Sequence, residues 1–197
     1  MVSYSEALKF ILQWEGGFVD DPDDHGGRTN EGITQKAYHA YLESHGRSDS
    51  DVKNITDAEV ADIYRSSYWL IARCDKLSSE LSFCHFDTAV NMGSNRAAKI
   101  LQRASGCPED GEIGTKTLDA CAAIDEKKAI IAYCDIRDGL YHAFASKPNQ
   151  TKFLKGWMNR LNSLRVVLHI RAPDRGGFKA EPTQRIPDIA EGDGLSA

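Results

Sequence analysis

The sequence predicts a mostly α fold with a short irregular hairpin or loop after the first helix. Three observations predict this class. Apolar residues recur at the three- and four-residue spacing of a helix face through most of the chain, and capping signatures stand before several of these stretches. Runs that alternate apolar and polar residues, as strands do, are nearly absent. The 197 residues suffice for one domain of good size or for two small ones packed together.

The first helix is predicted to begin after Ser3 and to end at Glu15. Ser3 and Glu6 form a capping box, and Gly16, followed by a second glycine, stops the helix. At this helix end, the negative pole of the helix dipole and burial beside Trp14 both disfavour an ionised carboxylate. A carboxyl group that stays protonated near neutral pH is what a glycosidase needs as its proton donor, although a glutamate at a frayed helix end can also turn to solvent. Glu15 continues an apolar stripe formed by Tyr4, Leu8, Ile11 and Leu12.

The segment 18–33 is crowded with turn formers and predicts the hairpin or loop. Acidic residues at alternate positions from Asp21 suggest a calcium-binding loop, but Gly32 stands at the twelfth position, where a bidentate glutamate is required. The 6 histidines include no H-E-x-x-H pair. The sequence therefore predicts neither a metal nor a cofactor.

An acidic partner for Glu15 is expected in this loop, because sugar hydrolysis commonly pairs a proton donor with a second carboxylate. Asp24 follows Glu15 by nine residues, and Thr29 lies five residues further along. A hydroxyl group beside a carboxylate can hold the attacking water, so the candidate catalytic residues are Glu15, Asp24 and Thr29. Asp24 can also be a solvated turn residue that caps its own backbone.

Seven further helices are predicted. Thr34 caps one over 35–44, and Thr56 with Glu59 forms a second capping box that opens the next. The inner face of that helix is predicted to carry Val60, Ile63, Tyr64 and Leu70. The other predicted helices span 79–92, 94–104, 115–124, 125–146 and 149–170, with a loop over 106–114.

Composition limits the partners and the location. The net charge of −5 argues against duplex nucleic acid, which usually meets a basic face. No run approaches the roughly 18 apolar residues of a membrane span, so stable membrane insertion is not expected. The amino terminus lacks the pattern of a secretory signal, which predicts synthesis in a cytoplasm. The 5 cysteines form no C-x-x-C pair and are expected to be reduced thiols.

Several ordered stretches carry a resemblance to a known family. The first group is Trp14-Glu15-Gly16-Gly17-Phe18, Asp21-Pro22, Gly26-Gly27, Thr29-Asn30 and Gly32-Ile33-Thr34. Later stretches are Tyr64-Arg65, Tyr68-Trp69, Phe86-Asp87, Ala89-Val90-Asn91, Leu101-Gln102, Asp110 to Gly114, and Phe153 to Trp157 with Asn159-Arg160. Together they resemble glycoside hydrolase family 108, whose members are muramidases that include phage endolysins and the secretion-associated lysozymes of Gram-negative bacteria.

The resemblance implies a lysozyme-like helical fold and hydrolysis of the β-1,4 bond between N-acetylmuramic acid and N-acetylglucosamine in peptidoglycan glycan strands. Glu15 stands at the family's catalytic glutamate. The spacing from Asp24 to Thr29 is one residue shorter than in the phage lysozymes, which the chain resembles more loosely. Asp20 and Asp21 are therefore rivals for the second carboxylate.

The resemblance also implies a division into a catalytic region over 1–86 and a helical peptidoglycan-binding region over 87–171 packed on it. Residues 172–197 are rich in Pro, Gly, Asp and Ala and predict a flexible tail.

Three residues are expected to bind the substrate, namely Asn30, Tyr68 and Asn91. Tyr68 is a candidate for stacking on a sugar ring. Asn91 can line the groove or simply end its helix.

A monomer is expected, acting in the periplasm or cell wall and needing a holin or an export system to reach it. Two alternatives remain open. One is a non-catalytic peptidoglycan-binding protein that keeps the fold. The other is a lytic transglycosylase, which uses one glutamate and no second carboxylate.

Overall fold

The computed structural model describes residues 2–19 and 27–170, and within them it confirms the predicted mostly α fold. The helices are α1 (Tyr4–Glu15), α2 (Gln35–Ser44), α3 (Asp57–Tyr64), α4 (Ser79–Met92), α5 (Ser94–Ser105), α6 (Thr115–Ala123), α7 (Glu126–Ala145) and α8 (Leu154–Val167). Short 3₁₀ turns lie at Val52–Asn54, Cys74–Lys76 and Thr151–Phe153, and a π-helical segment spans Arg65–Trp69. The predictions for Asp20, Asp21, Asp24 and the tail 172–197 fall outside the described residues.

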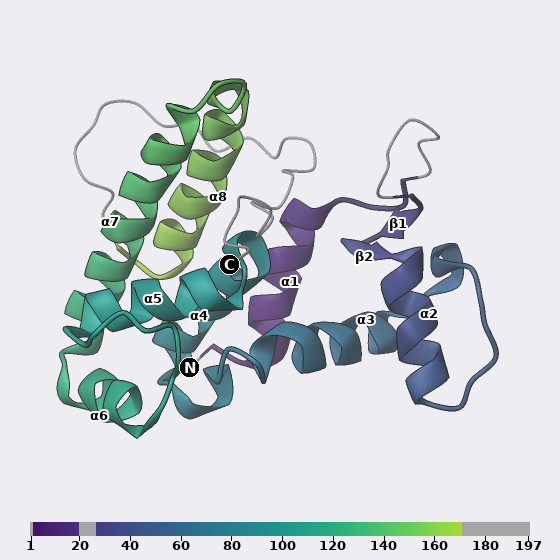
Figure 1. The fold of residues 1–197 in the computed structure, drawn as a ribbon, viewed down its shortest axis with the longest axis horizontal. Helices are drawn as coiled ribbons and strands as arrows, with labels where there is room; N and C mark the ends of the chain where they lie inside the picture. The colour runs from purple at the N-terminus through teal and green to yellow at the C-terminus, as the bar shows by residue number, and fades with distance from the viewer. Residues whose placement is uncertain (1, 20–26, 171–197) are drawn as a thin grey trace.

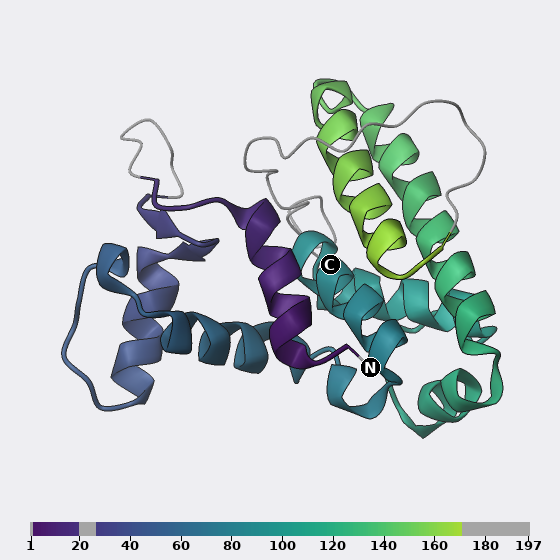
Figure 2. The same cartoon turned by 180° about the vertical axis from the view of Figure 1, so that it is seen from behind.

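The helices form two ends joined by α1 and α4. Figure 1 shows α2, α3 and the small sheet at one end, and α7 beside α8 at the other. Figure 2 gives the same arrangement from behind, with α1 between the two ends. Every residue of α4 from Leu81 to Met92 is buried, which is the pattern of a helix enclosed by the core on all sides. The helix α4 contacts α1, α5 and α7, and α1 in turn contacts α3, so α4 and α1 together connect the two ends.

The predicted helix starts are confirmed at the atomic level. The Ser3 side chain accepts a hydrogen bond from the backbone N–H of Glu6, whose carboxylate accepts from the Ser3 backbone. Thr56 and Glu59 form the same reciprocal pair at α3. These signatures succeed because a capping box involves residues only three positions apart and needs no tertiary contact.

The prediction that Leu70 lies on the inner face was wrong. Its backbone N–H donates to the Arg65 carbonyl, five residues earlier, as in a π-helix. The wider turn shifts the helix face, so Trp69 is buried while Leu70 is 43% and Ile71 62% exposed. A uniform 3.6-residue period cannot foresee this change of phase.

The first helix leads into a two-stranded antiparallel sheet of β1 (Thr29–Asn30) and β2 (Ile33–Thr34). The turn residues Glu31 and Gly32 have φ values of 48° and 77°, which is the left-handed geometry that two-residue hairpins favour. Val19 pairs with Thr29 in an isolated antiparallel bridge. The predicted hairpin is therefore present, and its turn is fixed in a conformation that suits glycine at position 32.

No helix among the described residues is long and apolar enough to cross a membrane. The same part of the chain holds no group of three or more His, Cys, Asp or Glu side chains that could bind a metal ion.

A buried histidine in α4 makes the fold sensitive to pH. The His85 ring is fully buried, and its Nε2 donates to the Ala72 carbonyl at 3.1 Å while Nδ1 lies 3.0 Å from the Tyr133 hydroxyl. Burial lowers the pKa of His85 from 6.5 to about 4, although the Ala72 hydrogen bond acts in the opposite direction. The native state therefore holds this imidazole in its neutral form.

The pKa of His85 is lower in the folded than in the unfolded chain. Its contribution to the free energy of unfolding is therefore fully present above pH 6.5 and is lost as the pH falls toward 4. Lowering the pH from 7 to 5 should therefore reduce the free energy of unfolding by about 2 kcal/mol through this residue. Urea denaturation at each pH measures it. His85→Gln should be less stable overall but show a shallower pH dependence, and equal slopes for both proteins would contradict the prediction.

Candidate active site

Glu15 is the last residue of α1 and is 3% exposed, so it does not turn to solvent. Its Oε1 accepts a hydrogen bond from a guanidinium nitrogen of Arg160 at 2.7 Å. Arg160 lies in α8 and was not predicted to have a role. Two effects therefore oppose each other at this carboxyl group: burial disfavours its negative charge, whereas the adjacent guanidinium favours it.

Arg160 belongs to a buried chain of alternating charges. Its Nε donates to one oxygen of Asp87 at 2.8 Å, and Arg137 donates to the other oxygen at 2.6 Å. Burial alone would raise the pKa of Asp87, but the guanidiniums of Arg160 and Arg137 hold it below its usual value. Two acids thus alternate with two arginines in the protein interior, and Asp87 lies between both guanidinium groups. We call Glu15, Arg160, Asp87 and Arg137 the charge network.

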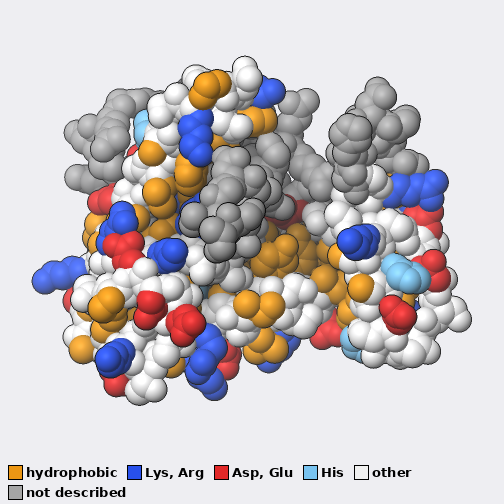
Figure 3. All heavy atoms as spheres, in the orientation of Figure 1, with side chains coloured by type: hydrophobic (Ala, Val, Ile, Leu, Met, Phe, Trp, Pro, Cys, Tyr) orange, Lys and Arg blue, Asp and Glu red, His pale blue; other side chains and the backbone are white. Residues whose placement is uncertain are grey.

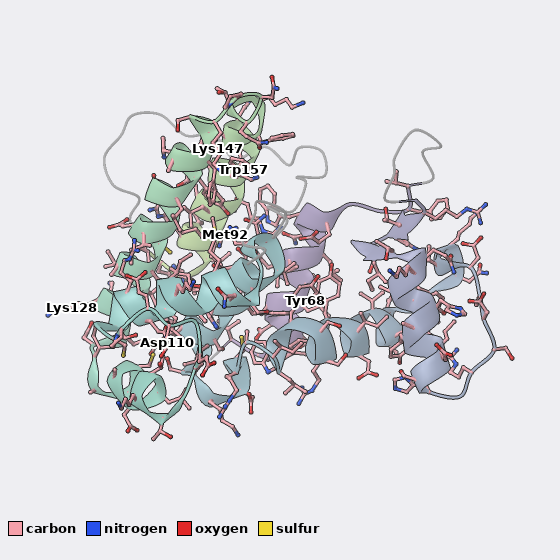
Figure 4. The ribbon with its side chains drawn as sticks, viewed as in Figure 1. Tyr68, Met92, Asp110, Lys128, Lys147 and Trp157 are labelled. Carbon is pink, nitrogen blue, oxygen red and sulfur yellow. The ribbon has the colours of Figure 1, made fainter. Side chains whose placement is uncertain are left out.

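Asn91 lies inside the protein next to the charge network. Its side chain is fully buried, and its Oδ1 accepts from the Tyr141 hydroxyl and from Arg137. The Tyr141 ring stacks on Trp157 with centroids 5.5 Å apart (Figure 4 labels Trp157). In this conformation no surface of Asn91 faces a groove, so its contacts give it a structural role. Its expected contact with substrate is untested.

The hairpin turn lies directly against Glu15. A Cβ atom added to Gly32 would come 3.2 Å from Glu15 Oε2 and 2.6 Å from the Tyr64 hydroxyl. That hydroxyl donates to the carbonyl of Glu31 at 2.8 Å, which fixes the turn in place. The close approach therefore requires glycine at position 32. Thr29, on β1 of the same hairpin, is also buried.

The other predicted site residues lie around this hairpin. Asn30 is half-buried and donates to the Val52 carbonyl at 3.3 Å. Tyr68 is also half-buried, and its ring centroid lies 5.6 Å from that of Tyr64 (Figure 4). Glu31 is a further carboxyl group in the turn. Its partial burial raises its pKa, and the negative charge of Asp57 raises it further. The structure thus gathers Thr29, Asn30 and Glu31 on the hairpin that packs over Glu15.

The charge network has a signal in the sequence. Arg160 falls on the same helical stripe as Trp157, Leu161 and Leu164, and Asp87 falls in a run of buried residues. Glu15 likewise is a charged residue that continues an apolar stripe. Its partner could not be named, however, because Arg160 is 145 positions away in the chain.

Replacing Arg160 with methionine should destabilise the protein by about 3–5 kcal/mol, because buried Asp87 would lose one of its two counter-charges and Glu15 would lose its hydrogen-bond donor. Urea denaturation at pH 7 measures the change. Arg103→Met is the matched control, since the Arg103 pair with Glu109 is exposed and its loss should leave the unfolding midpoint near that of the wild type. Equal midpoints for the two variants would contradict the prediction.

The chain is similar to known families and to a solved structure. A family model described as glycosyl hydrolase 108 matches residues 8–93, and one described as a predicted peptidoglycan domain matches residues 96–162. The structure of Brucella abortus SagA is 35% identical with a TM-score of 0.67, over 83% of this chain and 92% of that chain. No curated protein matches. The chain belongs to the glycosyl hydrolase 108 family and is a peptidoglycan hydrolase of the muramidase type.

Proposed function

We propose that Glu15 is the proton donor for cleavage of the β-1,4 bond between N-acetylmuramic acid and N-acetylglucosamine. The observation that carries this proposal is a buried carboxyl group whose two oxygens differ in their surroundings. Arg160 binds Oε1, whereas Oε2 lies beside the hairpin turn at Gly32. Oε2 is then the oxygen that carries the proton and gives it to the glycosidic oxygen.

In this scheme Arg160 is a positioning residue. It fixes the plane of the carboxyl group through Oε1, and it stabilises the negative charge that remains on Glu15 after the proton has left. Asp87 holds the guanidinium in turn, at 2.8 Å. The helix α8 therefore supports a reaction at the end of α1, although the two elements belong to different matched regions.

For the attacking water we propose Asp24 as the base and the Thr29 hydroxyl as its partner. The position of Thr29 supports this, since it is buried on the strand that leads into the turn over Glu15. A water between two carboxyl groups implies inversion, for which separations of roughly 6.5–9.5 Å are typical. Nuclear magnetic resonance of the first product formed distinguishes inversion from retention.

The Glu15→Gln variant should lose activity by about a thousandfold or more, because the amide cannot donate a proton to the leaving oxygen. Release of reducing ends from purified sacculi measures the loss. Glu59→Gln is the matched control, because Glu59 is also a buried glutamate bonded to an arginine, Arg47, but it lies in the α3 capping box. It should keep its specific activity while folded. An active Glu15→Gln protein would overturn the assignment.

Mass spectrometry of the same products separates the alternatives. Saturated reducing ends support hydrolysis, 1,6-anhydro ends support a lytic transglycosylase, and binding without release supports a non-catalytic protein.

Among variants of the candidate second carboxylates, Asp24→Asn should lose the most activity, because its oxygen is proposed to take a proton from the water. The comparison set is Asp20→Asn, Asp21→Asn and Glu31→Gln, each assayed on sacculi under the same conditions. Full activity of Asp24→Asn together with loss in one of the others would transfer the role to that residue.

Gly32→Ala should lower kcat/KM at least about tenfold, since the new methyl group must displace the Tyr64 hydroxyl or Glu15 Oε2 and small displacements of catalytic groups are costly. Gly46→Ala is the control. Its φ of 63° carries a similar backbone cost of about 1 kcal/mol, but no atom lies within 4 Å of the added carbon. Equal activity of the two variants would show that the contact at Gly32 does not matter.

We also propose that the protein acts in the periplasm or cell wall as a phage endolysin or a secretion-associated muramidase. Peptidoglycan lies outside the cytoplasmic membrane, so a holin or an export system must deliver the enzyme. Lysis on expression with a holin, compared with expression alone, tests this route.

A further inference from the structure

A hollow lies where the region matched by the peptidoglycan domain model borders the region matched by the glycosyl hydrolase model. Its volume is about 470 Å³, within the range of small-ligand sites. Three segments line it: residues 71–73 after the π-helical segment, the start of α5, and the loop 111–113 before α6. No member of the charge network lines it. Figure 4 labels Asp110 at the start of the loop, well away from Tyr68.

The loop wall of this hollow is held rigidly by one buried side chain. The Gln102 amide nitrogen donates to Asp110 Oδ1 at 2.6 Å and to the Glu112 carbonyl at 3.1 Å, and its oxygen accepts from the Gly111 backbone at 2.9 Å. Gly111 has a φ of 84°, and a Cβ there would meet Asn95 at 2.7 Å. A wall fixed in this way loses little entropy when a ligand binds.

The hollow offers both signs of charge at separate places. Arg73 stands on one side with a left-handed φ of 56°, and its guanidinium lies 3.5 Å from the Ile113 carbonyl. The first turn of α5 opens beside it, and no side chain caps those backbone N–H groups. The exposed carboxylate of Glu112 lies on the loop side. Figure 3 agrees with this mixed character, since acidic and basic side chains are interspersed over the face that includes α5 and α6.

Apolar side chains also line the hollow. Ile71 is 62% exposed because the π-helical segment turns it outward, and Ala98 and Ile113 continue the lining. A ligand that matches all three features has an aliphatic stem and an end that carries a carboxylate and an ammonium group together.

We propose that this hollow binds the zwitterionic end of a diamino-acid side chain in a peptidoglycan stem peptide. Arg73 and the first turn of α5 would take the carboxylate, Glu112 the ammonium group, and Ile71 the methylene stem. The proposal rests on the proposed function, because it names a second part of the same polymer. A stem peptide with meso-diaminopimelate has such an end, whereas one with lysine has only the ammonium group.

Isothermal titration of the full chain with two synthetic tripeptides tests this site. One is L-Ala-γ-D-Glu-meso-diaminopimelate and the other carries L-Lys at the third position. We expect the first to bind about tenfold more tightly, because the extra carboxylate gains charge-assisted hydrogen bonds. Glutamine bears about the same cost for the left-handed φ at position 73 as arginine does. The Arg73→Gln variant should therefore bind the two peptides with equal affinity. Glu112→Gln should weaken both.

Arg103→Gln is the matched control, since Arg103 lies on α5 but pairs with Glu109 outside the hollow. It should keep the tenfold preference. Equal binding of the two peptides to the wild type, binding of neither, or an unchanged preference in Arg73→Gln would overturn the proposal. Release of reducing ends from sacculi by the same wild-type preparation is measured alongside. If the preparation hydrolyses sacculi but binds both peptides equally, the proposed binding site is refuted and the proposed function is not.

Discussion

The ion pairs of Arg160 are the interaction on which the rest of the structure depends. A guanidinium cannot lose its proton inside a protein, so a fully buried arginine must bring acids with it. Glu15 and Asp87 meet that demand, and they come from two different helices. These ion pairs join α1, α4 and α8 at one buried position. They also explain why a peptidoglycan-binding stretch and a catalytic stretch are packed through a shared core.

Local sequence signals predicted the fold well because most helix ends are decided locally. Ser3, Thr34 and Thr56 all cap helices as expected. Leu70 was misplaced because the π-helical segment Arg65–Trp69 breaks the 3.6-residue period on which the prediction relied.

The candidate site was predicted only in part, for the same reason. The burial of Glu15 follows from its own helix, and the hairpin follows from a run of turn residues. The partner of Glu15 does not, because pairing across 145 positions is a property of the packed helices. Asn91 was expected to line the groove or to end its helix, and its bond to Tyr141 in the core likewise joins residues far apart in the chain.

The place of Arg160 in the chain has a consequence for biosynthesis. Translation runs from the amino terminus, so Glu15 leaves the ribosome 145 residues ahead of the arginine that seats it. An unfinished polypeptide that stops before α8 contains Glu15 but lacks Arg160, which binds it. The buried ion pair of Glu15 can therefore form only after α8 has left the ribosome.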